Sequence, residues 1–108
     1  METIPIDYLQ KLDIRVGTIV HAEKVENADK LLKLTVAFGE ETRTILTAMA
    51  MYYQPEHFVG KQMPFILNLE PRKIRGIESQ GMILAADTEE GPALLHPERK
   101  IPDGSKVI

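Results

Sequence analysis

The 108 residues of this chain suffice for one domain, and their composition, 44% hydrophobic and 27% charged, is that of a globular rather than a disordered chain. The absence of cysteine excludes disulfides, thiolate metal sites and a thiol nucleophile. No apolar run approaches the roughly 18 residues of a membrane span, and the N-terminus lacks the positive start of a signal peptide. We therefore expect a single cytoplasmic domain over residues 1–108 with no membrane partner.

The net charge of −3 is distributed unevenly along the chain. Residues 1–60 carry six Lys or Arg against nine Asp or Glu, and residues 78–108 carry three against six. Between them, residues 61–77 carry four against one, a local net charge of +3. A positive island in an acidic chain indicates a local anion site, whereas a protein that coats nucleic acid by charge alone is basic throughout. A solvated turn is the alternative explanation.

The first predicted elements are a short N-terminal helix and a long strand. The helix places Tyr8, Leu9 and Leu12 on one face. The apolar residues of the strand over residues 14–20 change phase across Gly17, which predicts a bend or bulge at that glycine.

The following strands complete the pattern of a small barrel. Apolar residues alternate over residues 32–38, so Lys33 faces outward, and the β-rich run over residues 42–48 pairs with this strand and brings Arg43 near Lys33. One helical turn follows Pro55, and strands are predicted over residues 61–67 and 81–86. Five strands with a short helix between the third and the fourth is the order of an all-β OB-fold barrel, here over about residues 12–87.

Residues 88–108 exceed what a minimal five-stranded barrel needs. They contain two apolar patches, one at Leu94 and Leu95 and one at Val107 and Ile108, separated by turn-forming residues. These patches either pack on the barrel or meet another chain.

The candidate site is the stretch between the fourth and fifth strands, residues 68–82. Arg72, Lys73 and Arg75 place three cations within four positions, and the proline before them and the glycines after them favour turns. Such a presented basic loop can grip an anion. Met82 at its end is explained most simply by core packing, although a thioether can also lie against a base or sugar.

The motifs of common enzymes are missing. There is no glycine-rich phosphate loop, and Ser79 is one residue off the spacing of a hydrolase nucleophile elbow. His21, His57 and His96 lie in three different elements without metal-ligand spacing. We expect no catalysis, no metal and no cofactor.

Four motifs in this order resemble one known family. They are Leu-Asp-Ile-Arg-Val-Gly at 12–17, Ala-Asp-Lys-Leu at 28–31, Tyr-x-Pro-Glu-x-x-Val-Gly-Lys at 53–61, and Asn-Leu-x-Pro-Arg-Lys-Ile-Arg-Gly-Ile-x-Ser-x-Gly-Met at 68–82. The chain resembles the structure-specific tRNA-binding domain that occurs appended to methionyl-tRNA synthetases, in the endothelial monocyte-activating polypeptide group and as free-standing dimeric proteins. One departure is Thr47-Ala48, followed by Met51, where many members carry Ser-Gly and then a basic residue.

The resemblance implies an OB-fold that dimerises through segments outside the barrel and binds the outer corner of tRNA by shape, without catalysis. The implied partners are tRNA, a second copy of the chain and the catalytic subunit of methionyl-tRNA synthetase. The residues expected to bind tRNA are Lys33, Arg43, Asn68, Arg72, Lys73, Arg75, Ser79, Gln80 and Met82. Those expected at the dimer interface are Tyr8, Leu9, Leu12, Leu94, Leu95, Val107 and Ile108.

A dimeric chaperone-like protein linked to bacterial protein export has a similar start and a similar basic loop. Its turn after that loop usually lacks the Ser-x-Gly-Met pattern, so residues 79–82 favour the tRNA binder. The chaperone is kept as the alternative function.

Overall fold

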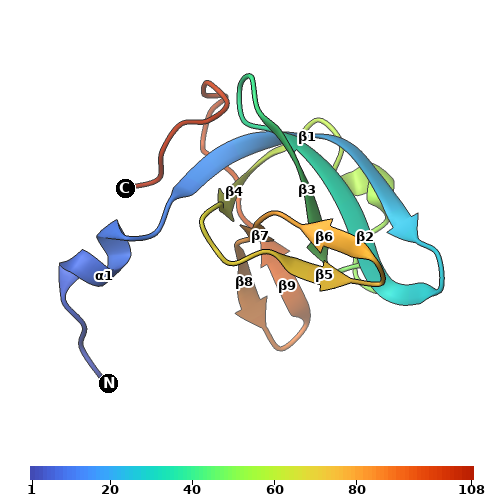
Figure 1. Ribbon diagram of the computed structural model, residues 1–108, viewed down its shortest axis with the longest axis horizontal. Helices are drawn as coiled ribbons and strands as arrows, with labels where there is room; N and C mark the ends of the chain where they lie inside the picture. The colour runs from blue at the N-terminus through green and yellow to red at the C-terminus, as the bar shows by residue number, and fades with distance from the viewer.

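Strands make up nearly all of the regular structure in the computed structural model, which describes residues 1–108 (Figure 1). The elements in chain order are α1 (Ile6–Gln10), β1 (Ile14–Val25), β2 (Ala28–Ala37), β3 (Thr42–Thr47), the 3-10 turn η1 (Pro55–His57), β4 (Gln62–Ile66), β5 (Arg72–Ile74), β6 (Ile77–Ser79), β7 (Met82–Ile83), β8 (Ala85–Thr88) and β9 (Gly91–Leu94). The predicted all-β class is confirmed.

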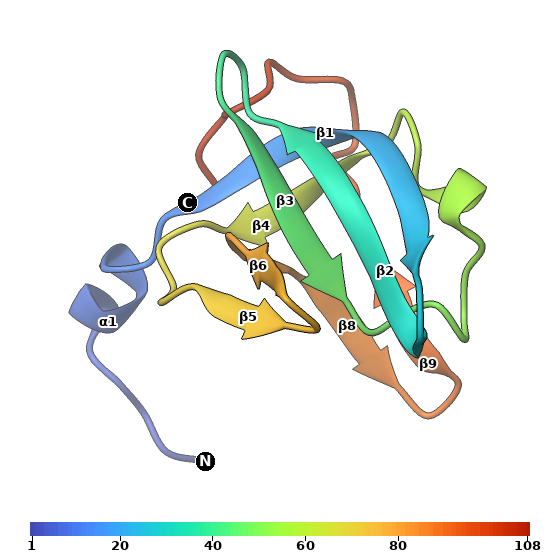
Figure 2. The same ribbon diagram turned by 45° about the vertical axis from the view of Figure 1, so that its right-hand side comes forward.

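One antiparallel sheet with the strand order β3-β2-β1-β4-β7 forms the body of the molecule (Figures 1 and 2). The long β1 pairs with β4 along its first half and with β2 along its second half, so it belongs to both sides of the curved sheet. The two edge strands, β3 and β7, contact each other but form no ladder. The five-stranded sheet is therefore not closed into a complete barrel.

Side chains of residues 79 and 80 occupy the gap where such a ladder would form. The backbone N–H of Leu46 donates to Ser79 Oγ at 3.0 Å, and that of Thr44 donates to Gln80 Oε1 at 2.9 Å. Because these N–H groups already have partners, the edge of β3 does not need a ladder with β7.

The distortion in β1 lies at Val20 and not at Gly17 as expected. Pairing with β2 skips Val20, since Ile19 lies opposite Val36 and His21 lies opposite Thr35. A side chain at position 17 would clash with the core, because a Cβ there would lie 2.6 Å from the ring of Phe38. The glycine lets this aromatic side chain cross β1 closely.

The strand predicted over residues 81–86 is broken after Ile83. The N–H of Leu84 donates to the carbonyl oxygen of Pro64 at 3.0 Å, but Pro64 has no N–H with which to return a bond. The β4–β7 ladder therefore ends, and β8 pairs with β9 instead.

The core confirms the alternation expected for the second strand. The four apolar residues of that run, Leu32, Leu34, Val36 and Phe38, are all buried. Phe58 and Phe65 are the largest fully buried side chains. The core lies between β1, β2, β3 and β4, and it leaves the β5–β6 hairpin at the outer surface (Figure 2).

The C-terminus lies near the start of β1, whereas the N-terminus lies farther away, beyond α1 (Figure 1). Near the C-terminus, the N–H of Val107 donates to the carbonyl oxygen of Ile14 at 2.8 Å, and the N–H of Gly104 donates to that of Val16 at 2.7 Å. The helix α1 has no buried residue. None of the helices has the length and apolar character that a membrane span requires.

Candidate nucleic-acid interface

The basic stretch, predicted as a loop, folds into a two-stranded hairpin, β5–β6. Its two turn residues, Arg75 and Gly76, both have positive φ, 53° and 78°. This is the pattern of a type I′ turn, whose twist matches that of the flanking strands. The signal in the sequence is Ile-Arg-Gly-Ile at 74–77, where the arginine takes the position at which Asn or Asp is usual.

The register of this hairpin separates its cations. Arg72 lies opposite Ser79, which is buried, so both are on the face that points toward the sheet. Lys73 lies opposite Glu78 on the outer face, and Arg75 is at the tip. The three cations are thus presented in three directions.

Ser79 anchors the hairpin. It is only 3% exposed, and its hydroxyl accepts a hydrogen bond from the N–H of Leu46 and donates one to the carbonyl oxygen of Gly81 at 3.0 Å. The expectation that Ser79 contacts RNA is corrected, because a side chain buried between hairpin and sheet cannot reach a surface ligand.

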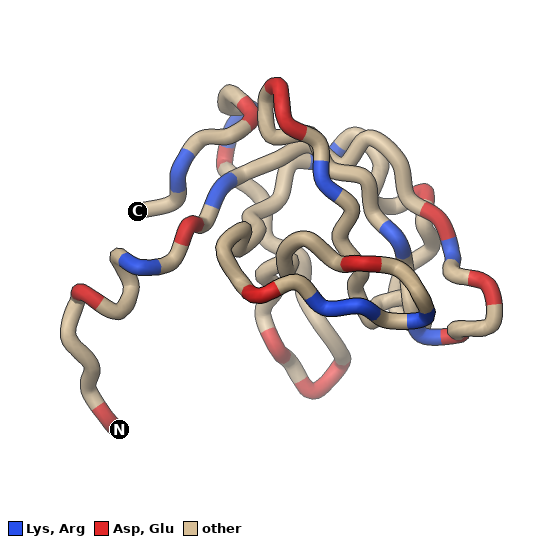
Figure 3. Tube along the Cα trace, in the orientation of Figure 1, with Lys and Arg blue, Asp and Glu red and all other residues tan.

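The hairpin cations have no acidic partner. Arg72, Lys73 and Arg75 are all exposed and take part in none of the four ion pairs of the chain. Figure 3 shows basic segments along β5 and at the turn of the hairpin, with acidic segments just before β5 and on β6. Unpaired surface cations on a rigid hairpin are suited to bind an external anion.

Lys33 and Arg43, expected to lie near each other, are on opposite faces of the β2–β3 ladder. Lys33 is opposite Leu46, and Arg43 is opposite Val36, three positions along. Lys33 faces outward as expected and lies 3.6 Å from a carboxylate oxygen of Glu23. It remains on the surface beside the hairpin.

The side chain of Arg43 links β3 to the segments that follow β4 and β6. Its guanidinium pairs with Glu41 and donates to the carbonyl oxygens of Leu67 at 2.8 Å and of Gln80 at 3.1 Å. These bonds use much of its donor capacity, so its position indicates a structural role.

Asn68 and Gln80 are also engaged by the protein. The side chain of Asn68 accepts from the N–H of Asp13 and donates to the carbonyl oxygen of Lys11, both at 2.7 Å. Gln80 Oε1 accepts from Thr44 as described above, while the residue itself is exposed. Asn68 thus ties the basic stretch to the segment before β1.

Met82 is 38% exposed and lines a hollow of about 260 Å³ between the hairpin and the ends of β2, β3 and β7. Seven of the nine residues around the hollow are hydrophobic, and Arg72 stands at its margin. Met82 therefore contributes to the surface of the site as well as to packing.

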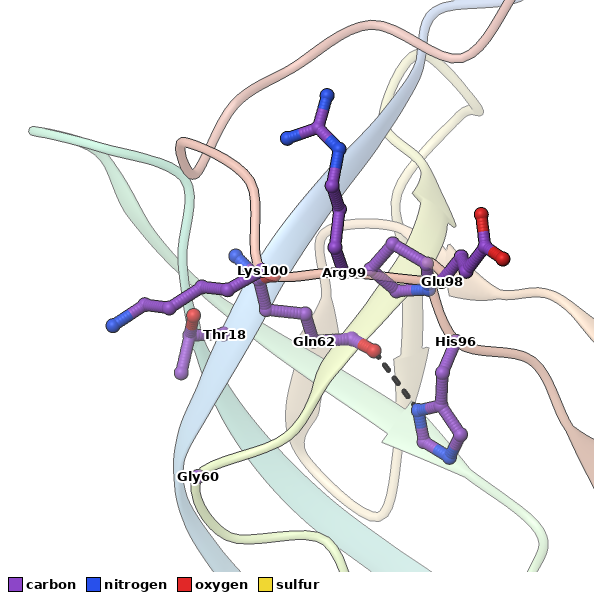
Figure 4. A pocket seen from close by; sticks show the side chains of 8 residues that line it. Thr18, Gly60, Gln62, His96, Glu98, Arg99 and Lys100 are labelled. Atoms are coloured by element: carbon purple, nitrogen blue, oxygen red, sulfur yellow. Dashed lines mark hydrogen bonds between the residues drawn. The ribbon is translucent and has the colours of Figure 1, made fainter.

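A second, polar pocket lies on another part of the surface, beside Gln62 (Figure 4). The side chain of Gln62 accepts a hydrogen bond from the N–H of Ile101 at 3.1 Å and donates one to the carbonyl oxygen of the same residue at 2.6 Å. The backbone carbonyl oxygen of Gln62 lies 3.0 Å from His96 Nδ1. The side chains of Arg99 and Lys100 extend in different directions, and Glu98 lies beside them (Figure 4). This mixed charge makes the pocket a weaker anion site than the hairpin.

The residues expected at the dimer interface divide into three sets. Leu9, Leu12, Val107 and Ile108 line one apolar groove between α1 and the C-terminus. Tyr8 on α1 and Leu95 are exposed. Leu94 is partly buried and packs against the core of its own domain.

The fold and the hairpin define a class: a small all-β domain that presents an unpaired basic surface to a polyanion. The family model described as "Putative tRNA binding domain" matches residues 14–106. The chain belongs to this tRNA-binding domain family.

Individual relatives agree with this assignment. The chain is 50% identical over 105 residues to a methionine–tRNA ligase of Bacteroides fragilis, a match that covers 96% of this chain and 16% of the relative. It therefore spans about a sixth of the length of that relative.

Solved structures cover the whole chain. A MetRS related protein from Pyrococcus horikoshii has a TM-score of 0.95 and 41% identity, with 100% of both chains covered. The chaperone CsaA from Bacillus anthracis has a TM-score of 0.89 and 26% identity, with 99% of this chain and 100% of that chain covered.

Proposed function

We propose that this domain binds folded tRNA without catalysis and grips its phosphates with Arg72, Lys73 and Arg75. The observation that carries the proposal is that these three exposed cations stand on one hairpin outside every ion pair of the chain. Arginine and lysine match phosphate oxygens, and each neutralised phosphate releases counterions that favour binding. Lys33 on the outer face of β2, which pairs with Glu23, is proposed as a weaker further contact.

The curved sheet is, in this proposal, an OB-type barrel over about residues 12–87, with residues 88–108 as an extension. The strand order and the turn η1 between β3 and β4 support it. The hairpin then belongs to the connection before the last barrel strand, a loop that OB-folds use for oligonucleotides.

Two chains are proposed to assemble through the groove between α1 and the C-terminus. Leu9 is 47% exposed and Val107 39%, and an apolar groove of this kind is suited to be covered by the same region of a second copy. A two-fold dimer would present two hairpins to one RNA, so each would raise the effective concentration of the other.

The synthetase connection is also a proposal, since the chain spans 16% of the matched methionine–tRNA ligase. We propose that the domain captures tRNA for such an enzyme, either as part of it or as a partner. Binding energy supplied away from the reacting atoms would lower the tRNA concentration that the enzyme needs. Affinity purification of the chain from its native cells, followed by identification of the co-purifying proteins, tests the partnership.

A chaperone function is the alternative, and the specific observation in its favour is the likeness to CsaA. A competition experiment distinguishes tRNA binding from the chaperone function. The chain is offered labelled folded tRNA together with excess unlabelled tRNA, a single-stranded RNA of equal length, or an unfolded polypeptide. Recognition of RNA shape predicts that only folded tRNA competes well at equal concentration. Effective displacement by the unfolded polypeptide would support the chaperone, and equal displacement by the single-stranded RNA would contradict shape recognition.

A further inference from the structure

We propose that the hollow beneath the β5–β6 hairpin receives one unpaired nucleobase of the bound tRNA and detects that this base is unstacked, not which base it is. The inference rests on the proposed tRNA-binding function. It adds a second contact of different chemistry to the phosphate contacts described above.

The geometry of the hollow fits a flat apolar group. Leu46 forms its floor, Ile74 of the hairpin and Leu31 of β2 form its sides, and Met82 and Ala48 reach its rim. Its volume of about 260 Å³ lies just below the range of roughly 300–1,000 Å³ typical of small-molecule sites. A base can pack against such an aliphatic surface because its largely apolar face is then removed from water.

The charges around the hollow fit the phosphates attached to a base. Arg72 lies on the hairpin face that points toward the sheet, at the margin of the hollow. Lys33 is on the same outer face of β2 as Leu31, two residues away. A nucleotide whose base enters the hollow would thus have the unpaired Arg72 for a flanking phosphate, with Lys33, which pairs with Glu23, as a weaker second cation. An apolar peptide side chain offers no such negative charge.

The lining also explains why base identity would not be read. Thr47 and Arg72 supply the only polar side chains of the lining, and Thr47 is buried. Discrimination between bases requires hydrogen bonds to their edges, which apolar walls cannot make. The hollow would therefore accept any base that is unstacked, and preference for folded tRNA would still come from the shape of the RNA.

Abasic interference on tRNA tests this directly. Each unpaired nucleotide of one folded tRNA transcript is replaced in turn by an abasic one, and the affinity of the full chain is measured. We expect at least one position where the abasic change weakens binding about tenfold or more, since removal of the base exposes the apolar surface of the hollow to water. Replacing that base by another base should change affinity less than about threefold.

Ala48→Leu fills the hollow from its exposed rim without changing charge. This variant should bind intact tRNA about tenfold more weakly and bind the abasic and intact forms equally, with an unchanged salt dependence. Ala86→Leu, which adds the same atoms at an exposed position on β8, should retain the abasic sensitivity. Met82→Ala, which removes part of the rim, should reduce that sensitivity and gives an independent readout should Ala48→Leu unfold.

Several results would overturn the inference. One is equal binding of every abasic tRNA and intact tRNA by the unaltered chain, and another is an abasic sensitivity that persists in Ala48→Leu. Loss of apolar-peptide binding in Ala48→Leu, with tRNA binding unchanged, would assign the hollow to a peptide instead. Failure of the unaltered chain to bind tRNA at all would overturn the proposed function itself.

Discussion

Lys73 lies directly opposite Glu78 across the β5–β6 ladder, on the face of the hairpin that points away from the sheet. Opposed residues on one face of an antiparallel pair have neighbouring side chains, so this carboxylate offsets part of the charge of the lysine. Arg72 has the buried Ser79 opposite it and no such carboxylate. The two adjacent cations of the basic stretch are therefore not equivalent.

The first prediction concerns this inequality. Arg72→Ala should weaken tRNA binding about tenfold or more, since a hydrogen bond to a charged group contributes roughly 1.5–3 kcal/mol. Lys73→Ala should weaken it less, and Glu78→Gln should strengthen it about two- to fivefold by removing a negative charge on the same face as the lysine. Fluorescence titration with labelled tRNA at low salt measures all three. An equal loss for both alanine variants, with no gain for Glu78→Gln, would contradict the asymmetry.

The second prediction separates stability from affinity at the hairpin tip. Arg75 has a φ of 53°, a left-handed conformation that asparagine adopts more readily than arginine. Arg75→Asn should therefore stabilise the protein by about 0.5–1 kcal/mol and yet weaken tRNA binding about tenfold. Arg75→Lys, which keeps the charge, is the control and should change neither quantity much. If Arg75→Asn kept full affinity, the tip would not be a contact.

The third prediction tests the structural role of Ser79. Ser79→Ala leaves the N–H of Leu46 without its partner in a buried place, which costs about 1–3 kcal/mol of unfolding free energy. Thr88→Ala removes an exposed hydroxyl that bonds to the carbonyl oxygen of Gly91 and should cost less than about 1 kcal/mol. Urea denaturation measures both. Equal costs would show that the hydrogen bond to Leu46 is not what holds the hairpin.

The fourth prediction concerns assembly. Leu9→Glu places a charge in the groove between α1 and the C-terminus and should convert a dimer into a monomer. Affinity for tRNA should then fall at least tenfold, because two linked hairpins bind more tightly than one. Met51→Glu adds the same charge at an exposed residue outside the groove and should leave the mass unchanged. Light scattering that reports a monomer for the unaltered chain would refute the dimer.

The sequence predicts most of the fold because burial follows strand periodicity. The alternation from Leu32 to Phe38 places all four apolar residues in the core, as expected. The last strand was predicted too long because its end depends on a distant residue, the proline at position 64 in β4. The β5–β6 hairpin was missed because its strands have three residues each and Arg75 takes the place of the usual turn residue.

The candidate site is less predictable than the fold. The basic island itself is visible in the sequence, and the structure places its three cations on one exposed hairpin. Sequence alone cannot tell that Ser79 is buried, because a small hydroxyl group suits both a surface and the interior when a backbone N–H needs a partner. The hollow next to Met82 combines residues from four strands and has no local signature.

The measurement that tests the central claim most directly is the salt dependence of tRNA binding. Three phosphate contacts per chain and two chains give six contacts, so affinity should fall by several hundredfold or more between 50 and 200 mM salt, at a slope of roughly 0.7–0.9 per contact. The double variant Arg72→Ala with Arg75→Ala should bind weakly and show a slope lowered by about two thirds of this value. A flat titration for the unaltered chain, or an unchanged slope and affinity for the double variant, would contradict phosphate gripping by the hairpin.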